Sequence, residues 1–453
     1  NDAPTPHPST IRQLIAMGVE DPDDDCIAIG DVTTAYLNGN KYGSSQPAKF
    51  VKFRKHRKAE WIVMQMIGSM YGGDDGAIDW YDTIDEYLQE EGFQKNGNEP
   101  CLWRNPITKL NVAAHSDDVA ARGRNSEVDN FFSKLNSVWP LKGNAWRKVM
   151  ENGPSVRFLG KDVSKISKED GSMWYKISQR NDIHQFLEEQ NMLGVRPVAS
   201  PMADKNELYG DSRGVTTAEH KWARSVNGSI AQFSKETRWD IAMETNRIAQ
   251  TMESPTQGTL SALRRVMAYM AGTLDHCLMV PVTNANVWTS YVDSDHAGDR
   301  ATGTKSRSGI IFCLNGMPAH WRSSKQPITA VSSTEAEIYA LSEAAKDVRH
   351  RYWVAEDMGD KQEWPALINV DNAAAIIFQR KVNVDGKLKG MIDLRQNWVK
   401  ELKDTKVLQA VKVDTKYNLA DALTKCMTGT DKRRMQQIVK DLAEDISKKY
   451  NSK

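Results

Sequence analysis

The stretch from Tyr291 to Leu341 constrains the fold of this 453-residue chain more than any other. An apolar run over 287–292 ends on an acidic residue, Asp293. Two more apolar runs flank the pair Asn315-Gly316, which is typical of a two-residue β-hairpin turn. Apolar residues then recur every three or four positions, as on one face of a helix. The sequence therefore predicts a strand, a hairpin and a helix, with a carboxylate ending the strand and another, Glu337, in the first helical turn.

Two further carboxylates follow in the same direction along the chain. Asp371 comes after a short apolar run, and Asp421 lies in NLADALTK, a pattern typical of a helix start. Each of the four carboxylates also has an ordinary structural interpretation. Asp293 can be a turn residue, Glu337 can complete a capping box opened by Thr334, and the other two can cap helices. Taken singly, each of these ordinary interpretations is a fair one.

Four motifs identify a family for this half of the chain. YVDSDHAGDRATGTKSRSG, SSTEAEIYALSEA, VDNAAAI and NLADALTK resemble, in order and spacing, the ribonuclease H domain of copia-type LTR retrotransposon polyproteins. The resemblance implies an α/β domain with a mixed five-stranded sheet. It also implies an activity, the cleavage of RNA in an RNA–DNA hybrid, and two Mg²⁺ (or Mn²⁺) ions held by catalytic carboxylates. Carboxylates suit this role because hard cations take oxygen ligands, and two such cations clamp the reacting phosphate. The implied ligands are Asp293, Glu337, Asp371 and Asp421.

The N-terminal half carries a second set of carboxylates. Asp31 ends a short apolar strand and opens DVTTAYLNG, and Asp117 and Asp118 lie between two apolar runs, as at the tip of a hairpin. Taken alone, the pair reads better as an ordinary turn. With SMYG at 69–72 and FLG at 158–160, however, the order resembles a copia-type reverse transcriptase, an α+β fold with fingers, thumb and an antiparallel palm sheet. The resemblance implies that these three aspartates are catalytic and hold two more Mg²⁺ or Mn²⁺ ions.

Other residues are candidates for binding nucleotide and nucleic acid. Tyr36 lies where the resemblance implies a ring beneath the incoming sugar that excludes a 2′-hydroxyl, although a core aromatic is an equal alternative. Asp75 replaces a nucleotide-contacting glutamine of the family, and its charge opposes a triphosphate. A basic run interleaved with Phe50 and Phe53 suits a template or primer, although it also fits a solvated face. Its basic residues are Lys49, Lys52, Arg54, Lys55, Arg57 and Lys58.

The sequence departs from the family at places that bear on activity. His115-Ser116 replace the first two residues of the family's YVDD, and Gly390-Met391 replace a basic pair. Two alternatives therefore stay open beside an active enzyme. One is a degenerate copy that folds and binds nucleic acid without activity, and the other is a protein active only as a nuclease. Because the polymerase departures lie beside its carboxylates, we expect the nuclease half to be better preserved.

Composition excludes several other classes of protein. Lys and Arg number 60 against 59 Asp and Glu, a net charge of +1, so affinity for nucleic acid must come from local patches. The five cysteines lie far apart without CxxC spacing, which argues against a zinc knuckle and favours reduced thiols. No apolar run is long enough to span a membrane.

The motifs also predict how the chain divides. We expect fingers and palm over 1–162, a largely helical thumb and connection over 163–283 and the ribonuclease H domain over 284–428. The C-terminal tail over 429–453 is helical in pattern, and we expect it to fray at its end, KKYNSK. The chain begins without methionine, as a segment of a longer polyprotein would. The resemblance implies an RNA template, an RNA primer, RNA–DNA hybrid, dNTPs and other segments of the polyprotein as partners. It implies a cytoplasmic virus-like particle as the location, with later nuclear entry.

Overall fold

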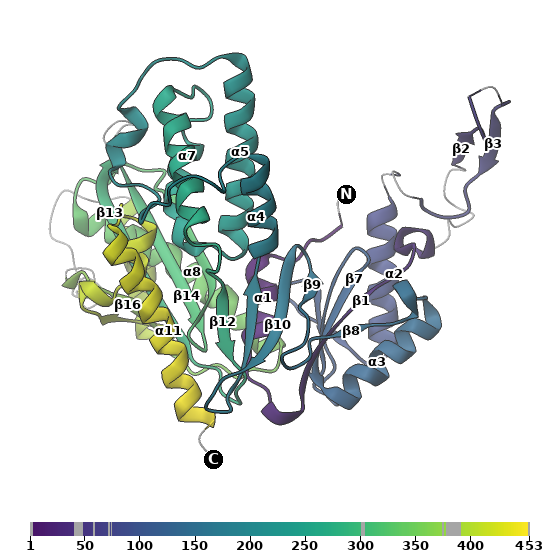
Figure 1. The fold of residues 1–453 in the computed structure, drawn as a ribbon. Helices are drawn as coiled ribbons and strands as arrows, with labels where there is room; N and C mark the ends of the chain where they lie inside the picture. Colours follow the sequence, from purple (N-terminus) through teal and green to yellow (C-terminus); the bar gives the residue numbers. More distant parts are fainter. Residues whose placement is uncertain are drawn as a thin grey trace.

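The computed structural model describes residues 3–39, 49–57, 59–70, 73, 75–299, 304–373, 376 and 391–451. Figure 1 shows an N-terminal sheet on the right, a bundle of helices at the upper left and a C-terminal sheet behind a long final helix. No helix in these ranges has the length and apolar character to cross a membrane.

The N-terminal sheet has six antiparallel strands in the order β4-β5-β6-β7-β1-β8. Side chains of β1 alternate between two cores, because successive residues of a strand point to opposite faces. Cys26 and Ala28 pack with helices α2 and α3, whereas Ile27 and Ile29 face the centre of the molecule. The elements are β1 (Asp25–Asp31), β4 (Gln94–Lys95), β5 (Leu102–Arg104), β6 (Asn111–His115), β7 (Asp118–Arg124), β8 (Arg147–Lys148), α2 (Gly76–Glu90) and α3 (Asn125–Val138).

A two-stranded hairpin projects away from this sheet (Figure 1). Its strands, β2 (Phe50–Phe53) and β3 (Ile62–Gln65), pair antiparallel and leave nearly every side chain exposed. An isolated hairpin buries little apolar surface and is marginally stable in water. This segment therefore lacks the packing that fixes the rest of the chain.

The middle of the chain combines helices with a sheet that the sequence analysis did not predict. Helices α4 (Arg180–Glu189), α5 (Thr217–Glu236), α6 (Ala242–Ala249) and α7 (Gln257–Ala271) agree with the expected helical character. The expectation of a largely helical region is incomplete, because this part of the chain also forms a four-stranded antiparallel sheet, β12-β11-β10-β9. Its strands are β9 (Val156–Phe158), β10 (Lys161–Ser167), β11 (Met173–Ser178) and β12 (Leu278–Pro281), so the boundary drawn after residue 162 falls inside β10.

The N-terminal helix α1 (Pro8–Ala16) lies at the centre, and nearly all its residues are buried. Arg12 donates hydrogen bonds from Nε to the carbonyl of Ala319 (2.8 Å) and from Nη1 to those of Lys235 (2.7 Å) and Glu236 (2.9 Å). Arg122 of β7 donates to the carbonyl of Leu14 at the other end of the helix (2.7 Å). One short helix therefore ties the N-terminal sheet, the helical bundle and the C-terminal sheet together.

The C-terminal sheet confirms the predicted mixed arrangement of five strands. Its order is β15-β14-β13-β16-β17, with β13, β14 and β15 antiparallel and β16 and β17 parallel to β13. Helices α8 and α10 cover one face, and the opposite face packs against the centre of the molecule. The elements are β13 (Trp288–Asp299), β14 (Lys305–Leu314), β15 (Met317–Lys325), β16 (Ala366–Val370), β17 (Leu408–Lys412), α8 (Ser333–Asp357) and α10 (Met391–Asp404).

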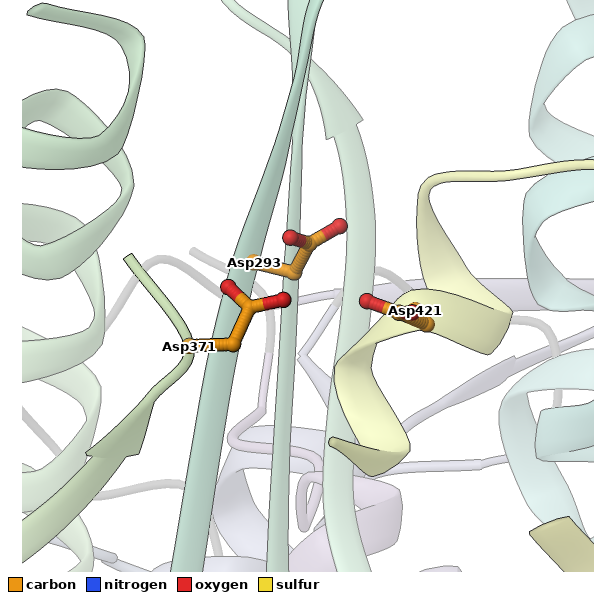
Figure 2. A group of neighbouring side chains, drawn as sticks. All are labelled: Asp293, Asp371 and Asp421. Carbon is orange, nitrogen blue, oxygen red and sulfur yellow. The ribbon is translucent and has the colours of Figure 1, made fainter. Parts of the chain in front are cut away.

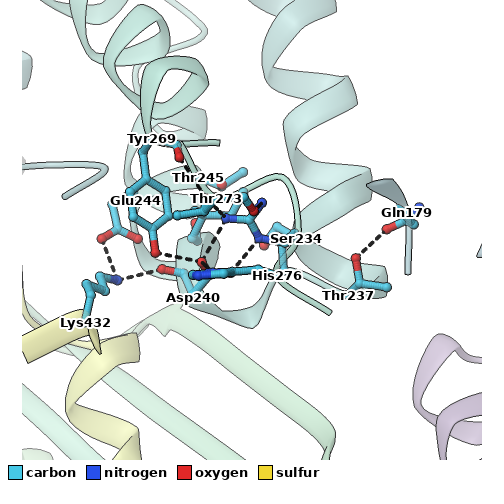
Figure 3. A network of polar contacts seen from close by, with 12 residues as sticks. Gln179, Ser234, Thr237, Asp240, Glu244, Thr245, Tyr269, Thr273, His276 and Lys432 are labelled. Carbon is cyan, nitrogen blue, oxygen red and sulfur yellow. Dashed lines mark hydrogen bonds and ion pairs between the residues drawn. The ribbon is translucent and has the colours of Figure 1, made fainter. Parts of the chain in front are cut away.

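The C-terminal tail forms the helix that its pattern predicts, α11 (Gly429–Asn451). Figure 3 shows how its Lys432 reaches a buried network in the helical bundle. Nζ of Lys432 donates to the carbonyl of Asp240 (2.6 Å) and lies 3.0 Å from Oε1 of Glu244. Asp240 in turn accepts from Arg238 (2.9 Å) and from the hydroxyl of Tyr269 (2.8 Å). An unpaired buried charge is costly, so this pairing fixes α11 to the bundle.

Candidate active sites

Three carboxylates converge at one edge of the C-terminal sheet (Figure 2). Asp293, Asp371 and Asp421 each place one oxygen so that the three atoms lie within 4.8 Å of one another. Two come from parallel neighbouring strands, where Val292 of β13 pairs with Val370 of β16 and the aspartates are the next residues. Because Val292 and Val370 are the last paired residues of two parallel strands, the aspartates that follow them lie side by side, although they are 78 positions apart in the sequence.

The third aspartate comes from a short 3₁₀ turn, η8 (Leu419–Leu423), which lies across β13 and β14. Asn418 fixes the turn by donating to the carbonyl of Val292 (3.1 Å). Gly309 of β14, directly opposite Asp293, allows the close approach. A Cβ atom there would lie 2.7 Å from both the carbonyl of Ala420 and Cγ2 of Thr424. The glycine in KSRSG is thus a functional position that the sequence analysis did not single out.

Burial and mutual repulsion perturb these acids. Burial raises the pKa of Asp293, with the charge of Asp371 adding to the effect. Burial and the charge of Asp293 raise the pKa of Asp421 to about 7. Lys425 opposes both shifts, with Nζ 2.9 Å from Asp421 and 3.3 Å from Asp293. The hydroxyl of Thr424 also donates to Asp293. Thr424 and Lys425 were missed as site residues, although both belong to the NLADALTK motif.

Glu337 lies beside this cluster without joining the 4.8 Å set. It is 5% exposed, and burial followed by the charges of Asp293 and Asp371 raises its pKa to about 8. Its Oε2 atom is buried and has no hydrogen-bond partner among the described residues. The carboxyl group does accept a hydrogen bond from the backbone N–H of Ser294, but a buried unpaired acceptor costs about 1–3 kcal/mol, so Oε2 favours a ligand beyond those that the described residues supply.

The structure rules out the ordinary interpretations that it can test. The α8 cap is Ser332, which accepts from the backbone N–H of Glu335 (3.1 Å), while Glu335 accepts from the N–H of Val331 (2.6 Å). Capping therefore belongs to Glu335 and leaves Glu337 without that role. Asp293 lies within a strand rather than a turn, and Asn418, not Asp421, caps η8. The residues that Asp371 would cap lie mostly outside the described residues.

The N-terminal carboxylates also lie near one another. Asp31 pairs directly across the sheet with Asp118, and Asp117 occupies the two-residue turn of the predicted β6–β7 hairpin. Burial, then the charges of Asp117 and Asp31, raises the pKa of Asp118 to about 6. Lys142 lies 3.5 Å from Asp31. Among the described residues, only the carboxylates of the C-terminal cluster have oxygens that all lie within 4.8 Å of one another. The three N-terminal carboxylates are therefore farther apart.

The aromatic candidate Tyr36 lies beside this hairpin. Its hydroxyl is 2.6 Å from Oγ of Ser116, one of the two residues that depart from the family pattern. The other, His115, is half-buried, and burial lowers its pKa. Its Nδ1 atom has no hydrogen-bond partner in the described part of the chain. Tyr36 is only partly buried, which leaves part of the ring accessible.

The remaining candidates surround the projecting hairpin. Asp75 forms an ion pair with Lys49, so its charge is partly balanced and Lys49 is not a free cation. Lys52 and Arg54 lie over the ring of Trp61, at 4.9 and 4.7 Å from its centroid. Lys55 and Arg57 are exposed, whereas Lys58 lies outside the described residues. Gly390 is likewise outside them, and Met391 begins α10.

The C-terminal residues fit a divalent cation. Three carboxylate oxygens within 4.8 Å provide the hard ligands that Mg²⁺ and Mn²⁺ prefer, and the unpartnered oxygen of Glu337 lies next to them. A cation would also relieve the repulsion that raises these pKa values. The N-terminal set offers the same ligand chemistry less closely gathered.

Comparisons with known proteins place these sites in context. Residues 2–204 match the family described as reverse transcriptase (RNA-dependent DNA polymerase). The retrovirus-related Pol polyprotein from transposon TNT 1-94 of Nicotiana tabacum is 28% identical over 410 residues, covering 87% of this chain and 29% of that protein. The corresponding protein from transposon RE1 of Arabidopsis thaliana is 27% identical over 409 residues, covering 88% and 26%.

More distant matches follow. The Ty1-DR6 Gag-Pol polyprotein of Saccharomyces cerevisiae is 22% identical over 409 residues, covering 87% of this chain and 22% of that protein. The chain thus spans less than a third of the length of each of these relatives. Among solved structures, LC11-RNase H1 in complex with an RNA/DNA hybrid is 17% identical and covers 30% of this chain and 94% of its own, with a TM-score of 0.24.

Proposed function

Because residues 2–204 carry a reverse transcriptase domain and the chain aligns with copia-type retrotransposon Pol polyproteins, we propose that it is an RNA-directed DNA polymerase that also cleaves the RNA of RNA–DNA hybrids. Because β9–β12 form one sheet, we assign polymerase fingers and palm to the part of the chain before β9, thumb and connection to the segment from β9 through β12, and ribonuclease H to 284–428. RNA template, primer, hybrid and dNTPs are its proposed substrates and partners.

The convergence of Asp293, Asp371 and Asp421 within 4.8 Å is the observation that carries the nuclease proposal. These three and Glu337 would hold Mg²⁺ or Mn²⁺, which when bound supplies Lewis-acid activation of water and charge stabilisation at the phosphate. Glu337, with its pKa near 8, holds a proton on its carboxyl group at neutral pH and would release it on becoming a ligand.

Two neighbouring residues prepare the cluster. Lys425 reduces the repulsion between Asp293 and Asp421 through its contacts with both carboxylates. Thr424 orients Asp293 by donating to it. Both come from the η8 region, so the motif supplies one ligand, a neutralising cation and an orienting hydroxyl.

The polymerase proposal depends on the pairing of Asp31 with Asp118 and on Asp117 beside them. These residues would hold the ions for nucleotide addition, with Tyr36 excluding a 2′-hydroxyl from the incoming sugar. The exposed hairpin β2–β3, with basic residues over Trp61, would contact template or primer through phosphate and base stacking.

One observation favours a narrower alternative, a protein active as a nuclease alone. Three of the four nuclease carboxylates have an oxygen within 4.8 Å of the other two, whereas the three polymerase carboxylates do not form such a group among the residues described. Even without an ion, the nuclease site therefore has the geometry that binding requires. The polymerase site would need a further shift of side chains.

Paired assays on one preparation distinguish these functions. Primer extension on an RNA template and cleavage of RNA in a hybrid are measured with Mg²⁺ and with Mn²⁺. Asp421→Asn should abolish cleavage and spare extension, and Asp118→Asn should do the reverse. Cleavage without extension would favour the nuclease alone. Loss of neither activity on substitution would show that a contaminant is responsible and refute the proposal.

A further inference from the structure

The hydroxyl of Ser116 contacts the residue proposed to select the sugar. Ser116 lies in the β6–β7 turn directly before Asp117, with a positive φ of 53°. Tyr36 lies on a separate 3₁₀ turn, η2 (Ala35–Asn38). Their hydroxyl oxygens are 2.6 Å apart, a normal hydrogen-bond distance, across 80 residues of sequence.

Ser116 is itself held in place. The indole N–H of Trp80 donates to its carbonyl oxygen at 2.6 Å. Trp80 is 1% exposed and packs edge-on against Trp139, with ring centroids 5.0 Å apart. Because Trp80 cannot move without disturbing this core, Ser116 is a fixed anchor for the phenol of Tyr36.

The anchor matters because a cavity of about 330 Å³ adjoins the pair. Tyr36, Ser116, Trp80, Tyr81 and His115 are among its lining residues. A cavity of about 150 Å³ is large enough to hold a benzene ring. The cavity therefore gives the ring of Tyr36 room to rotate if nothing holds its hydroxyl.

We propose that Ser116 is a specificity-determining positioning residue, whose hydroxyl holds the ring of Tyr36 against rotation into the cavity and so sets discrimination against ribonucleotides. This inference rests on the proposed polymerase function. The apolar residue that YVDD places here has no hydroxyl to offer. Ser116 is thus a working part of the site rather than a sign of decay.

The test compares the ratio of kcat/KM for a dNTP to that for the matching rNTP. Ser116→Ala should lower this ratio about threefold to tenfold, the range expected for one hydrogen bond. Alanine is strained at positive φ, so Ser116→Gly, which is not, should give the same loss. Tyr36→Phe removes the same bond from the other side. The double variant Tyr36→Phe/Ser116→Ala should lose no more than either single change, because both delete one interaction.

Tyr81→Phe is the matched control. Tyr81 lines the same cavity, but its hydroxyl donates to the carbonyl of Pro100 (2.9 Å). The change should leave the ratio as it is. A ratio unaltered in both Ser116 variants, or additive losses in the double variant, would overturn the inference while extension continues. Absence of primer extension by the unmodified chain at any dNTP concentration would instead contradict the polymerase proposal, and the inference with it.

Discussion

Glu337→Gln should stabilise the protein in the absence of divalent ions while abolishing RNA cleavage. Burial of this carboxyl group, followed by the charges of Asp293 and Asp371, raises its pKa from 4.5 to about 8. A glutamine of the same shape removes the ionisable group and its repulsion. It also removes a proposed cation ligand. The two effects have opposite signs, which an ordinary structural role would not produce.

The magnitude follows from the pKa. Each pKa unit corresponds to about 1.4 kcal/mol. Because the group keeps its proton in the fold but ionises freely in the unfolded chain, it lowers the free energy of unfolding by about 3 kcal/mol at pH 7 and about 4 kcal/mol at pH 8. Because the folded pKa is raised, stability is fully present below about pH 4.5 and is lost as pH rises towards 8. The amide retains the burial cost of a polar group, so we expect a net gain of about 2 kcal/mol at pH 8, or roughly 2 °C in Tm for a chain of this length.

Thermal unfolding in EDTA at pH 5 and pH 8 measures this gain, and cleavage of a labelled hybrid measures activity. The stabilisation should be small at pH 5 and largest at pH 8, and cleavage should fall more than about a hundredfold. Glu335→Gln is the matched control on the same helix, where it alters the cap and should cost no more than about 1 kcal/mol with cleavage retained. An equal loss of Tm at both pH values for Glu337→Gln would refute the reasoning.

Three further predictions concern the rest of the chain. Lys49→Ala should raise the KM for dNTP about three- to tenfold, because it leaves the charge of Asp75 unpaired, and adding Asp75→Gln should return the KM to its original value. An unchanged KM in Lys49→Ala would show that this ion pair lies away from the nucleotide. Arg12→Met should lower the free energy of unfolding by about 3–5 kcal/mol, because three backbone carbonyls lose their hydrogen-bond donor, and a reduced Tm would show it. As a control, Arg433→Met at an exposed position should change the free energy of unfolding by less than about 0.5 kcal/mol. Primer extension at limiting Mg²⁺ should fall as pH drops through about 6, where Asp118 becomes protonated, and a flat profile between pH 5 and 7 would contradict its role as a ligand.

The sequence by itself determined the local structure and the chemistry on offer. Asn315-Gly316 is compatible with few conformations other than a tight hairpin turn, and the structure has it between β14 and β15. Helical periodicity predicted α8, because it reports which side of an element is buried. The same local patterns predicted that Asp293 ends a strand and that Glu337 lies in a first helical turn. The structure corrects both positions: β13 continues past Asp293 to Asp299, and the acid in the first turn of α8 is Glu335.

Tertiary structure alone decided which of these elements meet. The β9–β12 sheet was missed because its strands are short and β12 pairs with β11 across about a hundred residues, a distance that no local pattern spans. The hydroxyl pair of Tyr36 and Ser116 and the ion pair of Lys49 and Asp75 likewise join separate segments. Gly309 acquires its role only when η8 packs onto it. Periodicity records that a face is buried, but the partner that buries it is chosen by packing over the whole chain.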